Sequence, residues 1–501
     1  MQYLVTGKEM KLLDQNTSKH FHVPELVLME QAAMAFVRKL FLLEGERGLS
    51  CKKALIVCGS GNNGADGLAI ARLLRQRGME PLLWPVGEQA GFTQSESYRV
   101  QRSICEAYGI AVTDRACSGA ELIIDAIFGT GLSRKVEGTL SEVIELVNRS
   151  AAWRVAVDIA SGISADTGEV LGNAFRADDT ITFSFGKVGQ YLWPGNEYSG
   201  TLHVVPIGIT QESFLSDRPK AAAHERGDLA LLPGRFAHSN KGTYGKLLVV
   251  AGSVNMAGAA CLCARAAYRA GTGLVRVLTP EENRLIIQTS VPEAVLTTYR
   301  ADSPDAQTIK DAVGWADAVV AGPGIGTGEG ARALLALVLD CVSVPTVLDA
   351  DALNILAKDC GRLSAPHADL IVTPHLGEMA RLTGHTVEHI QGALMESARQ
   401  FAETYGVVCV LKDFRTVTAV PGGLTYLNLS GNHGMATAGS GDVLSGVIGG
   451  LLAQGMKASV AASCGVYLHG LAGDAAARRT GKRALLASDI ADGLKELDLA
   501  E

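Results

Sequence analysis

The chain has 501 residues, with 45 Lys and Arg against 52 Asp and Glu, which gives a formal net charge of −7 at pH 7. This length exceeds a single small module and predicts two or three domains, each able to bury a core. Because the chain is mildly acidic and has no run of five or more like charges, we expect small-molecule partners, with no nucleic acid and no membrane.

Cysteine usage and hydrophobic patterning indicate the compartment. The ten cysteines show neither a CxxC pattern nor a regular spacing, so they are interpreted as small core residues of a reducing compartment. The first twenty residues lack an apolar segment of signal-peptide length, and no stretch reaches the roughly 18 apolar residues that span a bilayer. We therefore expect a cytoplasmic protein.

The first half repeats short apolar runs that end in glycine or aspartate loops. The expected strands lie within 54–64, 79–87, 121–131, 153–162, 178–186 and 201–208, and a helix is expected at 66–78. Continuous apolar runs favour a parallel sheet covered on both faces. Ligands of such sheets bind at the carboxyl ends of the strands, where the unusual residues of this half stand.

Residues 209–235 do not continue this series of short apolar runs and loops, which places a domain boundary near 215–225. A second series of strands is expected within 244–253, 273–280, 316–326, 345–354, 368–378 and 407–413, followed by a glycine-rich turn and an apolar helix at 437–455. We predict two different α/β domains, at 1–215 and 225–501.

The segment Gly59–Gly64, GSGNNG, follows a predicted strand and matches GxGxxG, which in dinucleotide-binding folds grips pyrophosphate. Two asparagines and the nearby Asp66 do not suit that role, because a carboxylate repels pyrophosphate. A glycine turn needed only for strand-to-helix geometry is the alternative.

Three further polar residues, Asp125, Asp158 and Ser161, also end predicted strands. Amide, carboxylate and hydroxyl oxygens of low total charge favour a weakly bound monovalent or alkaline-earth cation over zinc. The loop 129–134, GTGLSR, offers backbone N–H groups and a guanidinium for phosphate. Asp158 is left as a candidate acid or base.

GSGNNGADG, DAIFGTGL and VDIASGISADTG resemble the YjeF N-terminal type of NAD(P)H-hydrate epimerase over residues 1–213, which implies a Rossmann-like three-layer domain. The resemblance implies a potassium ion held by Asn63, Asp125 and Ser161. It implies that the substrate contacts Asn62, Asn63, Gly64, Ala65, Asp66, Gly129, Thr130, Gly131, Leu132, Ser133, Arg134, Lys135 and Asp158. Departures from the family pattern are Gln31 for Asn, Ser60 for Pro and Ala65 for Gly.

In the second half, Gly439-Ser440-Gly441-Asp442 opens the apolar helix. The N–H groups and dipole of such a turn form an anion hole. Asp442 would repel a phosphate there, so it is interpreted as a base that takes a proton from a hydroxyl beside a phosphoryl group. A helix-capping aspartate is the alternative. The absence of a Walker GxxxxGK[ST] motif argues against a P-loop ATPase.

GPGIG (322–326), DADALN (349–354), TPHLGE (373–378) and GNHGMATAGSGD (431–442) resemble, over 227–501, the ADP- or ATP-dependent NAD(P)H-hydrate dehydratases of the ribokinase-like superfamily. The resemblance implies a substrate pocket lined by Ala259, Gly324, Gly326, His375 and Asp442. It implies that ADP or ATP with Mg²⁺ is bound by Lys412, Asp413, Phe414, Arg415, Thr416 and Gly441. Asp413 and His433 depart from the usual Gly and Pro.

The two resemblances imply one repair task on hydrated NADH and NADPH: exchange of the R and S forms at C6, then nucleotide-driven dehydration of the S form. We also expect a homo-oligomer. The alternative is a ribokinase-like small-molecule kinase with a non-catalytic N-terminal nucleotide- or partner-binding module, because fold alone does not determine function. A kinase would leave a stable phosphorylated product.

Overall fold

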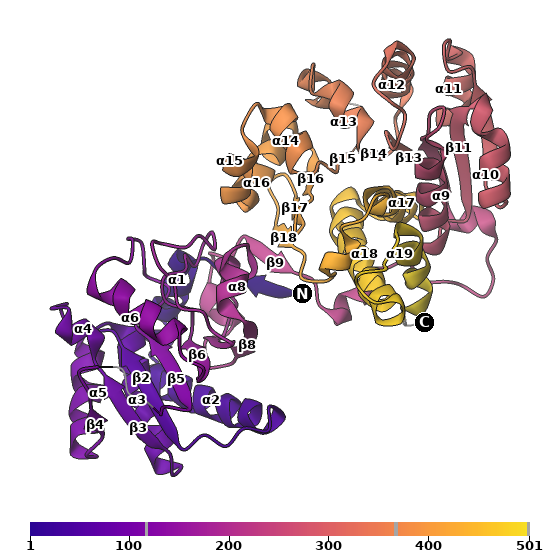
Figure 1. Cartoon of the computed structure of the whole chain (residues 1–501). Helices are drawn as coiled ribbons and strands as arrows, with labels where there is room; N and C mark the ends of the chain where they lie inside the picture. The colour runs from indigo at the N-terminus through magenta and orange to yellow at the C-terminus, as the bar shows by residue number, and fades with distance from the viewer. Residues whose placement is uncertain (116–118, 365–368, 498–501) are drawn as a thin grey trace. The chain divides into compact units, whose positions relative to one another are not determined.

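The computed structural model describes residues 1–115, 119–364 and 369–497, so Ala368, the first residue of one expected strand, lies outside it. The chain divides into two compact units, Tyr3–Ala221 and Met1–Gln2 with Ala222–Glu501 (Figure 1). Within the described ranges, no helix combines the length and apolarity that a membrane crossing requires.

The N-terminal unit is built on a seven-stranded sheet in the order β4-β3-β2-β5-β6-β7-β8. Every pair in it is parallel, as the continuous apolar runs predict. The strands are β2 (Lys53–Cys58), β3 (Glu80–Trp84), β4 (Ala111–Val112), β5 (Leu122–Ala126), β6 (Trp153–Val157), β7 (Asp179–Phe183) and β8 (Thr201–Val205).

Helices cover both faces of this sheet and make three layers. On one face lie α2 (Glu25–Glu46), α3 (Asn62–Gln76) and α5 (Glu96–Ala107), and on the other α6 (Thr139–Asn148) packs its apolar side against the sheet. The remaining helices are α1 (Gly7–Lys19), α4 (Val86–Gln89), α7 (Val188–Tyr191) and α8 (Gly195–Ser199). The expected three-layer domain is confirmed.

The strand order of this sheet reverses between β2 and β5. From β2 the chain moves outward to β3 and β4, and from β5 it moves the other way to β8. Crevices at such switch points, beyond the carboxyl ends of the strands, are where ligands of open α/β sheets bind. Both glycine-rich segments of this half follow these two strands.

The second sheet has 11 strands in the order β1-β9-β18-β17-β16-β15-β14-β13-β10-β11-β12. Strands β10 to β16 are parallel, and β17 and β18 add antiparallel pairs. Their bounds are β1 (Gln2–Leu4), β9 (Ala221–Ala223), β10 (Lys246–Val250), β11 (Leu274–Pro280), β12 (Val295–Tyr299), β13 (Ala318–Ala321), β14 (Thr346–Leu348), β15 (Leu370–Val372), β16 (Val408–Leu411), β17 (Val417–Ala419) and β18 (Thr425–Leu427).

A group of apolar helices covers one face of this sheet: α9 (Ala257–Arg269), α17 (Ser440–Ala453), α18 (Ala458–Thr480) and α19 (Ala487–Gly493). Gly446 allows α17 to pack closely on α9, because a Cβ there would lie 2.2 Å from the Cys263 carbonyl oxygen. The other helices are α10 (Arg284–Ser290), α11 (Ala306–Gly314), α12 (Glu329–Cys341), α13 (Asp351–Leu356), α14 (Leu376–Thr383), α15 (Val387–Gly392) and α16 (Leu394–Tyr405). Here the strand order reverses between β10 and β13.

Two boundaries differ from the sequence-based expectation. Helix α3 begins at Asn62, so the asparagines occupy its first turn instead of a loop before it. The strand expected at 79–87 ends at Trp84, because Pro85 starts the short helix α4. The α/β class of both units is as predicted.

Candidate functional sites

The N-terminal unit holds a cavity of about 920 Å³ at its switch point, between α1, α3 and the segments that follow β2, β5 and β6. Most of the predicted site residues line it: Asn62, Asn63, Asp66, Gly129, Thr130, Gly131, Leu132, Ser133, Arg134 and Asp158. Gly64, Ala65 and Lys135 are not among the lining residues. Gly64 instead lets α3 pack on the preceding turn, since a Cβ there would meet the Gly59 carbonyl oxygen at 2.0 Å.

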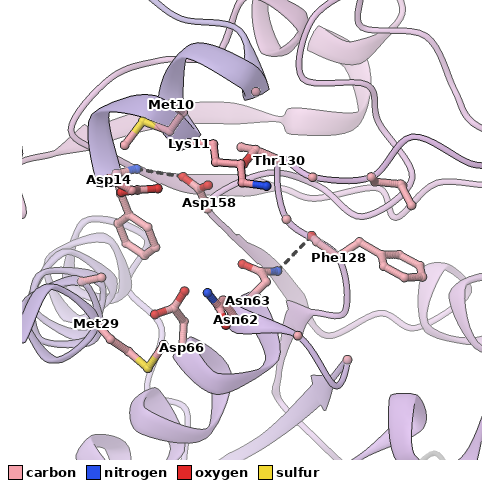
Figure 2. Close-up of a pocket in the computed structure, with 18 of the residues that line it drawn as sticks. Met10, Lys11, Asp14, Met29, Asn62, Asn63, Asp66, Phe128, Thr130 and Asp158 are labelled. Atoms are coloured by element: carbon pink, nitrogen blue, oxygen red, sulfur yellow. Dashed lines mark hydrogen bonds between the residues drawn. The ribbon is translucent and has the colours of Figure 1, made fainter. Parts of the chain in front are cut away.

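Asp158 follows β6 and is held in a strained backbone conformation, with φ of +66°. Its Oδ1 accepts hydrogen bonds from Thr182 Oγ1 at 3.0 Å, the Phe183 N–H at 3.1 Å and Lys187 Nζ at 2.5 Å. No described residue donates to its Oδ2. A non-glycine residue kept in this conformation by so many contacts is typical of a functional position. The free oxygen of Asp158 is available to a molecule in the cavity (Figure 2).

The partner of Asp158, Lys187, was not anticipated from the sequence. Its side chain is completely buried and forms an ion pair with Asp158. A lysine is rarely fully buried unless it is paired, so the ion pair with Asp158 accounts for the burial of Lys187 in this wall of the cavity. The position of Lys187 just past a buried strand was the available signal, although lysines are common in such loops.

The three residues expected to hold potassium lie together beneath the cavity. Asp125 is completely buried and accepts hydrogen bonds from the Ser161 hydroxyl at 2.7 Å and the Ser161 N–H at 2.8 Å. Asn63 Nδ2 donates to the carbonyl oxygen of Phe128 at 2.9 Å, and the Phe128 N–H donates to Ser161 Oγ at 2.8 Å. The Asp125 carboxylate, the Ser161 hydroxyl and the Phe128 carbonyl oxygen thus meet in one place, and Asn63 contacts this carbonyl through Nδ2.

This oxygen set fits a monovalent cation. Burial raises the pKa of Asp125 to about 6, although the Ser161 and Ile127 hydrogen bonds lower it. A nearby cation would supply the counter-charge that this buried carboxylate lacks. In the described part of the chain, no cluster of three or more His, Cys, Asp or Glu side chains is arranged to hold a metal ion.

Two further carboxyls of the cavity wall have raised pKa values. Asp14 of α1 lines the cavity. Burial, together with the charge of Asp158, raises the pKa of Asp14 to about 7. Asp66 of α3 has its pKa raised by burial and by the charges of Asp158 and Asp14. Asp14 was missed from sequence, because it stands in an amphipathic helix whose buried residues, Met10, Leu13 and Thr17, are the visible pattern.

The loop after β5 forms the rim of the cavity. Its first glycine, Gly129, passes close to Asn63, and a Cβ there would lie 3.3 Å from the Asn63 Cβ. The guanidinium of Arg134 stacks over Phe92, with its carbon 4.7 Å from the ring centroid. The rim therefore presents backbone N–H groups and one cation, the donors that a phosphate requires.

In the C-terminal unit, Ala259, Gly324 and Gly326 lie around the switch point between β10 and β13. The Gly252 N–H donates to the Pro323 carbonyl oxygen at 2.8 Å, which joins the segments after the two strands. Gly324 has φ of +63°, and a Cβ there would lie 3.0 Å from the Ala259 Cβ. Gly326 donates its N–H to Asp351 at 2.9 Å. Glycine at position 324 therefore allows the segment after β13 to lie close to the start of α9.

Asp442 stands in the first turn of α17, whose N-cap is Gly439 with φ of +89°. Asp442 is the third helical residue and makes no side-chain capping bond, so the capping alternative is wrong. Burial and the nearby Asp349 and Asp351 raise its pKa to about 7, against the effect of Lys412. A carboxyl with a pKa near neutrality, beside an anion hole, has the properties of a general base.

Asp349 and Lys412 form a buried ion pair next to Asp442. Lys412 Nζ donates to Asp349 Oδ1 at 2.8 Å, and Ser445 Oγ donates to Oδ2 at 2.6 Å. Burial acts to raise the pKa of Asp349, but Lys412 and the hydrogen bonds hold it below its usual value. Gly441 lies directly over the pair, since a Cβ there would be 3.3 Å from Lys412 Nζ. The sequence indicated Lys412 and Gly441 but missed Asp349 and Ser445 as members of the site.

His375 caps α14 through Nδ1, which accepts the Gly377 N–H at 3.0 Å. Its backbone pairs with Lys412, and the Lys412 N–H donates to the Pro374 carbonyl oxygen at 2.8 Å. Burial, Lys412 and Arg381 lower the pKa of His375. The structure thus brings His375 next to the lysine, while half of its ring remains exposed.

The remaining residues predicted to bind nucleotide form the approach to β17. Phe414 is about half exposed (52%), and the Arg415 guanidinium stacks on it while donating to the Leu429 carbonyl oxygen at 2.9 Å. Thr416 accepts the Asn428 N–H at 2.9 Å, and burial raises the pKa of Asp413. Only Lys412 of this segment is placed against Gly441.

Comparison with known proteins covers both units. A family model described as YjeF-related protein N-terminus matches residues 25–189, and one described as NAD(P)H-hydrate dehydratase matches residues 247–496. The chain is 40% identical over 98% of its length to a bifunctional NAD(P)H-hydrate repair enzyme of Moorella thermoacetica, of which 96% is covered. It is 36% identical to the Escherichia coli enzyme of the same name, over 92% of this chain and 89% of that one.

Among solved structures, a ribokinase-like superfamily protein of Enterococcus faecalis matches with a TM-score of 0.50 and 27% identity, over 55% of this chain and 95% of that one. An ADP/ATP-dependent NAD(P)H-hydrate dehydratase of Bacillus subtilis, co-crystallised with ATP and Mg²⁺, matches with a TM-score of 0.48 and 34% identity, over 54% of this chain and 95% of that one. The ribokinase-like fold expected for the second unit is confirmed.

Proposed function

The chain belongs to the family of bifunctional NAD(P)H-hydrate repair enzymes, and from that premise we propose that its two units carry out the two reactions at the sites described above. The N-terminal cavity exchanges the R and S hydrates of NADH or NADPH. The site at α17 dehydrates the S form with ADP or ATP. The small-molecule kinase alternative does not account for relatives that share both units over nearly the whole chain.

The observation that carries the assignment of residues is common to both sites: the proposed catalytic carboxyl either belongs to an Asp–Lys ion pair or lies beside one. In the first unit the ion pair itself contains the proposed catalytic residue, Asp158, whose second oxygen is free. In the second unit the proposed catalytic residue is Asp442, which lies beside Asp349 and Lys412.

At the second site, Asp442 takes the proton of the C6 hydroxyl as its oxygen attacks the terminal phosphoryl group of the nucleotide. The N–H groups at the start of α17 and the ammonium of Lys412 face the charge of that phosphoryl group. Expulsion of phosphate from C6 with loss of the C5 proton then restores the dihydropyridine. ADP leaves as AMP, and ATP leaves as ADP.

Bound groups are proposed from the donor sets. Asn63, Asp125, Ser161 and the Phe128 carbonyl would hold K⁺, which when bound supplies a positive charge beneath the rim loop. Mg²⁺ would enter with the nucleotide, as neutralisation of phosphate charge requires. The cytoplasm remains the proposed compartment, in keeping with the free state of all described cysteines, and a homo-oligomer remains a prediction.

Absorbance at 340 nm tests the proposal. A mixed sample of R and S NADH hydrate is incubated with the full chain, Mg²⁺, K⁺ and either ADP or ATP. Full recovery of NADH supports both activities, and the faster nucleotide identifies the donor. Recovery that stops at the S fraction would overturn the epimerase assignment. A stable phosphorylated product without NADH would overturn the dehydratase assignment.

A further inference from the structure

The N-terminal helix α1 is fixed on both sides of Asp14. A capping box between Thr6 and Glu9 starts the helix, and the Gly7 N–H donates to Asp166 at 2.7 Å. Near its end, Thr17 Oγ1 and Ser213 Oγ are hydrogen-bonded at 2.8 Å. The Asp14 side chain is therefore presented to the cavity from a rigid element, although α1 precedes the residues 25–189 matched by the family model.

The Asp14 carboxyl lies beside that of Asp158, and both face the cavity (Figure 2). Lys187 does not neutralise Asp14 by hydrogen bonding, since Asp158, Thr182 Oγ1 at 2.8 Å and the Phe183 carbonyl at 3.3 Å occupy the three donors of its ammonium. No described residue donates a hydrogen bond to the Asp14 carboxyl. Asp158 thus has the contacts of a charged carboxylate, and Asp14 has those of a carboxylic acid.

The chemistry of the substrate requires such a pair, an argument that rests on the proposed function. A hydroxyl on C6, next to ring atom N1, makes C6 a hemiaminal carbon. Its configuration is exchanged by opening and reclosing the C6–N1 bond. Opening needs one group to take the hydroxyl proton and another to give a proton to N1. Because the hydroxyl oxygen and N1 are bonded to the same carbon, two neighbouring carboxyl groups can reach both atoms.

We propose that Asp14 is the catalytic acid that works with Asp158 as base in epimer exchange. Asp158 removes the hydroxyl proton, C6 becomes a carbonyl as the C6–N1 bond breaks, and Asp14 gives its proton to N1. Rotation about the C5–C6 bond presents the other face of the carbonyl. N1 then adds to C6, returns its proton to Asp14, and the oxygen regains the proton from Asp158, so no net proton is consumed.

The electrostatics of the cavity support these roles. A pKa of about 7 lets Asp14 hold a proton near neutrality, where an acid must be protonated to act. The charged and titratable groups that share this wall of the cavity with it are Lys11, Glu25, Asp66, Asp158 and Lys187. Asp66 projects into the cavity from α3, across the cavity from Asp158 in the view of Figure 2, whereas the Asp14 carboxyl lies beside that of Asp158.

The test compares D14N with the unchanged full chain. Epimerisation is measured as recovery of absorbance at 340 nm from purified R hydrate with excess nucleotide, Mg²⁺ and K⁺, above the uncatalysed rate. We expect kcat to fall by about 10² or more with KM changed much less, because the amide fills the same space but cannot give a proton. Dehydration of purified S hydrate by the same preparation should be unchanged.

The pH profile separates a catalytic role from a structural one. The unchanged chain should lose epimerase kcat as pH rises through about 7, and D14N should lack that limb. D114N removes an exposed carboxyl outside the cavity and serves as the matched control with unchanged epimerase activity. If D14N keeps kcat within about threefold, or keeps the limb, the inference is wrong. If the unchanged chain itself does not epimerise, the proposed function fails instead.

Discussion

The sites of the two units share an arrangement of charged side chains. Each places a carboxyl whose pKa is raised to about 7 beside a buried Asp–Lys pair: Asp14 beside Asp158 and Lys187, and Asp442 beside Asp349 and Lys412. Each also has a non-glycine residue at positive φ within the pair's loop, Asp158 at +66° and Ala350 at +51°.

The two sites differ in which carboxyl group is proposed as the acid and which as the base. In the N-terminal unit the paired carboxylate has a free oxygen in the cavity and the unpaired carboxyl keeps a proton to give. In the C-terminal unit both oxygens of Asp349 accept hydrogen bonds from Lys412 and Ser445, so the unpaired Asp442 is the carboxyl proposed as the base. Similar pKa values therefore support opposite roles, and the contacts around each carboxyl decide the role.

The largest effect expected from this comparison is that of D442N on dehydration. We expect kcat for NADH recovery from S hydrate to fall by about 10³, because the amide cannot accept the hydroxyl proton. Epimer exchange, followed by NMR on separated R hydrate, should be unaffected. Loss of both activities would contradict two independent sites.

The two lysines test whether the ion pairs have equivalent roles. K187M should lower epimerase kcat by roughly 10- to 100-fold, because Asp158 loses the ammonium group that holds its Oδ1 in place, with little change in KM. K412M should raise KM for the nucleotide as well, since Lys412 also faces the anion hole. Steady-state kinetics on purified R and S hydrates checks both. Identical kinetic signatures in the two variants would count against the distinction.

The pH dependence should run in opposite directions for the two reactions. Asp442 must lose its proton to act, so dehydration kcat should rise about tenfold between pH 6 and pH 8. Asp14 must keep its proton, so epimerisation should fall over the same interval. Rates measured on one preparation across this range test the contrast. Parallel profiles would show that the two carboxyls do not have opposite roles.

The smallest expected effect concerns potassium and stability. Because the folded-state pKa of Asp125 is raised to about 6 from 3.8, the protonated form is favoured on folding, and its contribution to stability is lost as pH rises through about 6. K⁺ should offset this loss and raise the unfolding temperature by a few degrees at pH 8, with much less effect at pH 5.

Thermal unfolding of the full chain in KCl and in a large organic-cation chloride measures the potassium effect. D125N should abolish the difference between the two salts while leaving dehydration intact. An equal shift at both pH values would indicate a general salt effect and not a site.

The sequence by itself determined the parallel strands, the two switch-point loops and most of the residues on them. Runs such as ALIVC and KLLVV, and turns such as GSGNNG and TAGSGD, carry local requirements: an apolar strand buried on both faces, and a turn that exposes N–H groups. Requirements of this kind depend on neighbouring residues and are visible in a short segment. Asn63, Asp125, Asp158, Gly441 and Asp442 stand in such segments, whereas Lys412 was expected only from the resemblance to the dehydratase family.

Only the tertiary structure decided which of these residues act on one another. Lys187 and Asp158 stand 29 residues apart, and Lys412 and Asp349 stand 63 apart, so neither ion pair has a local pattern. Asp14 lies on a helix whose sequence shows only an amphipathic period, and its raised pKa arises from burial in the cavity and from the charge of Asp158. Burial and electrostatic coupling act through space, so the chain order that encodes a strand or a turn does not show which distant charges will share a cavity.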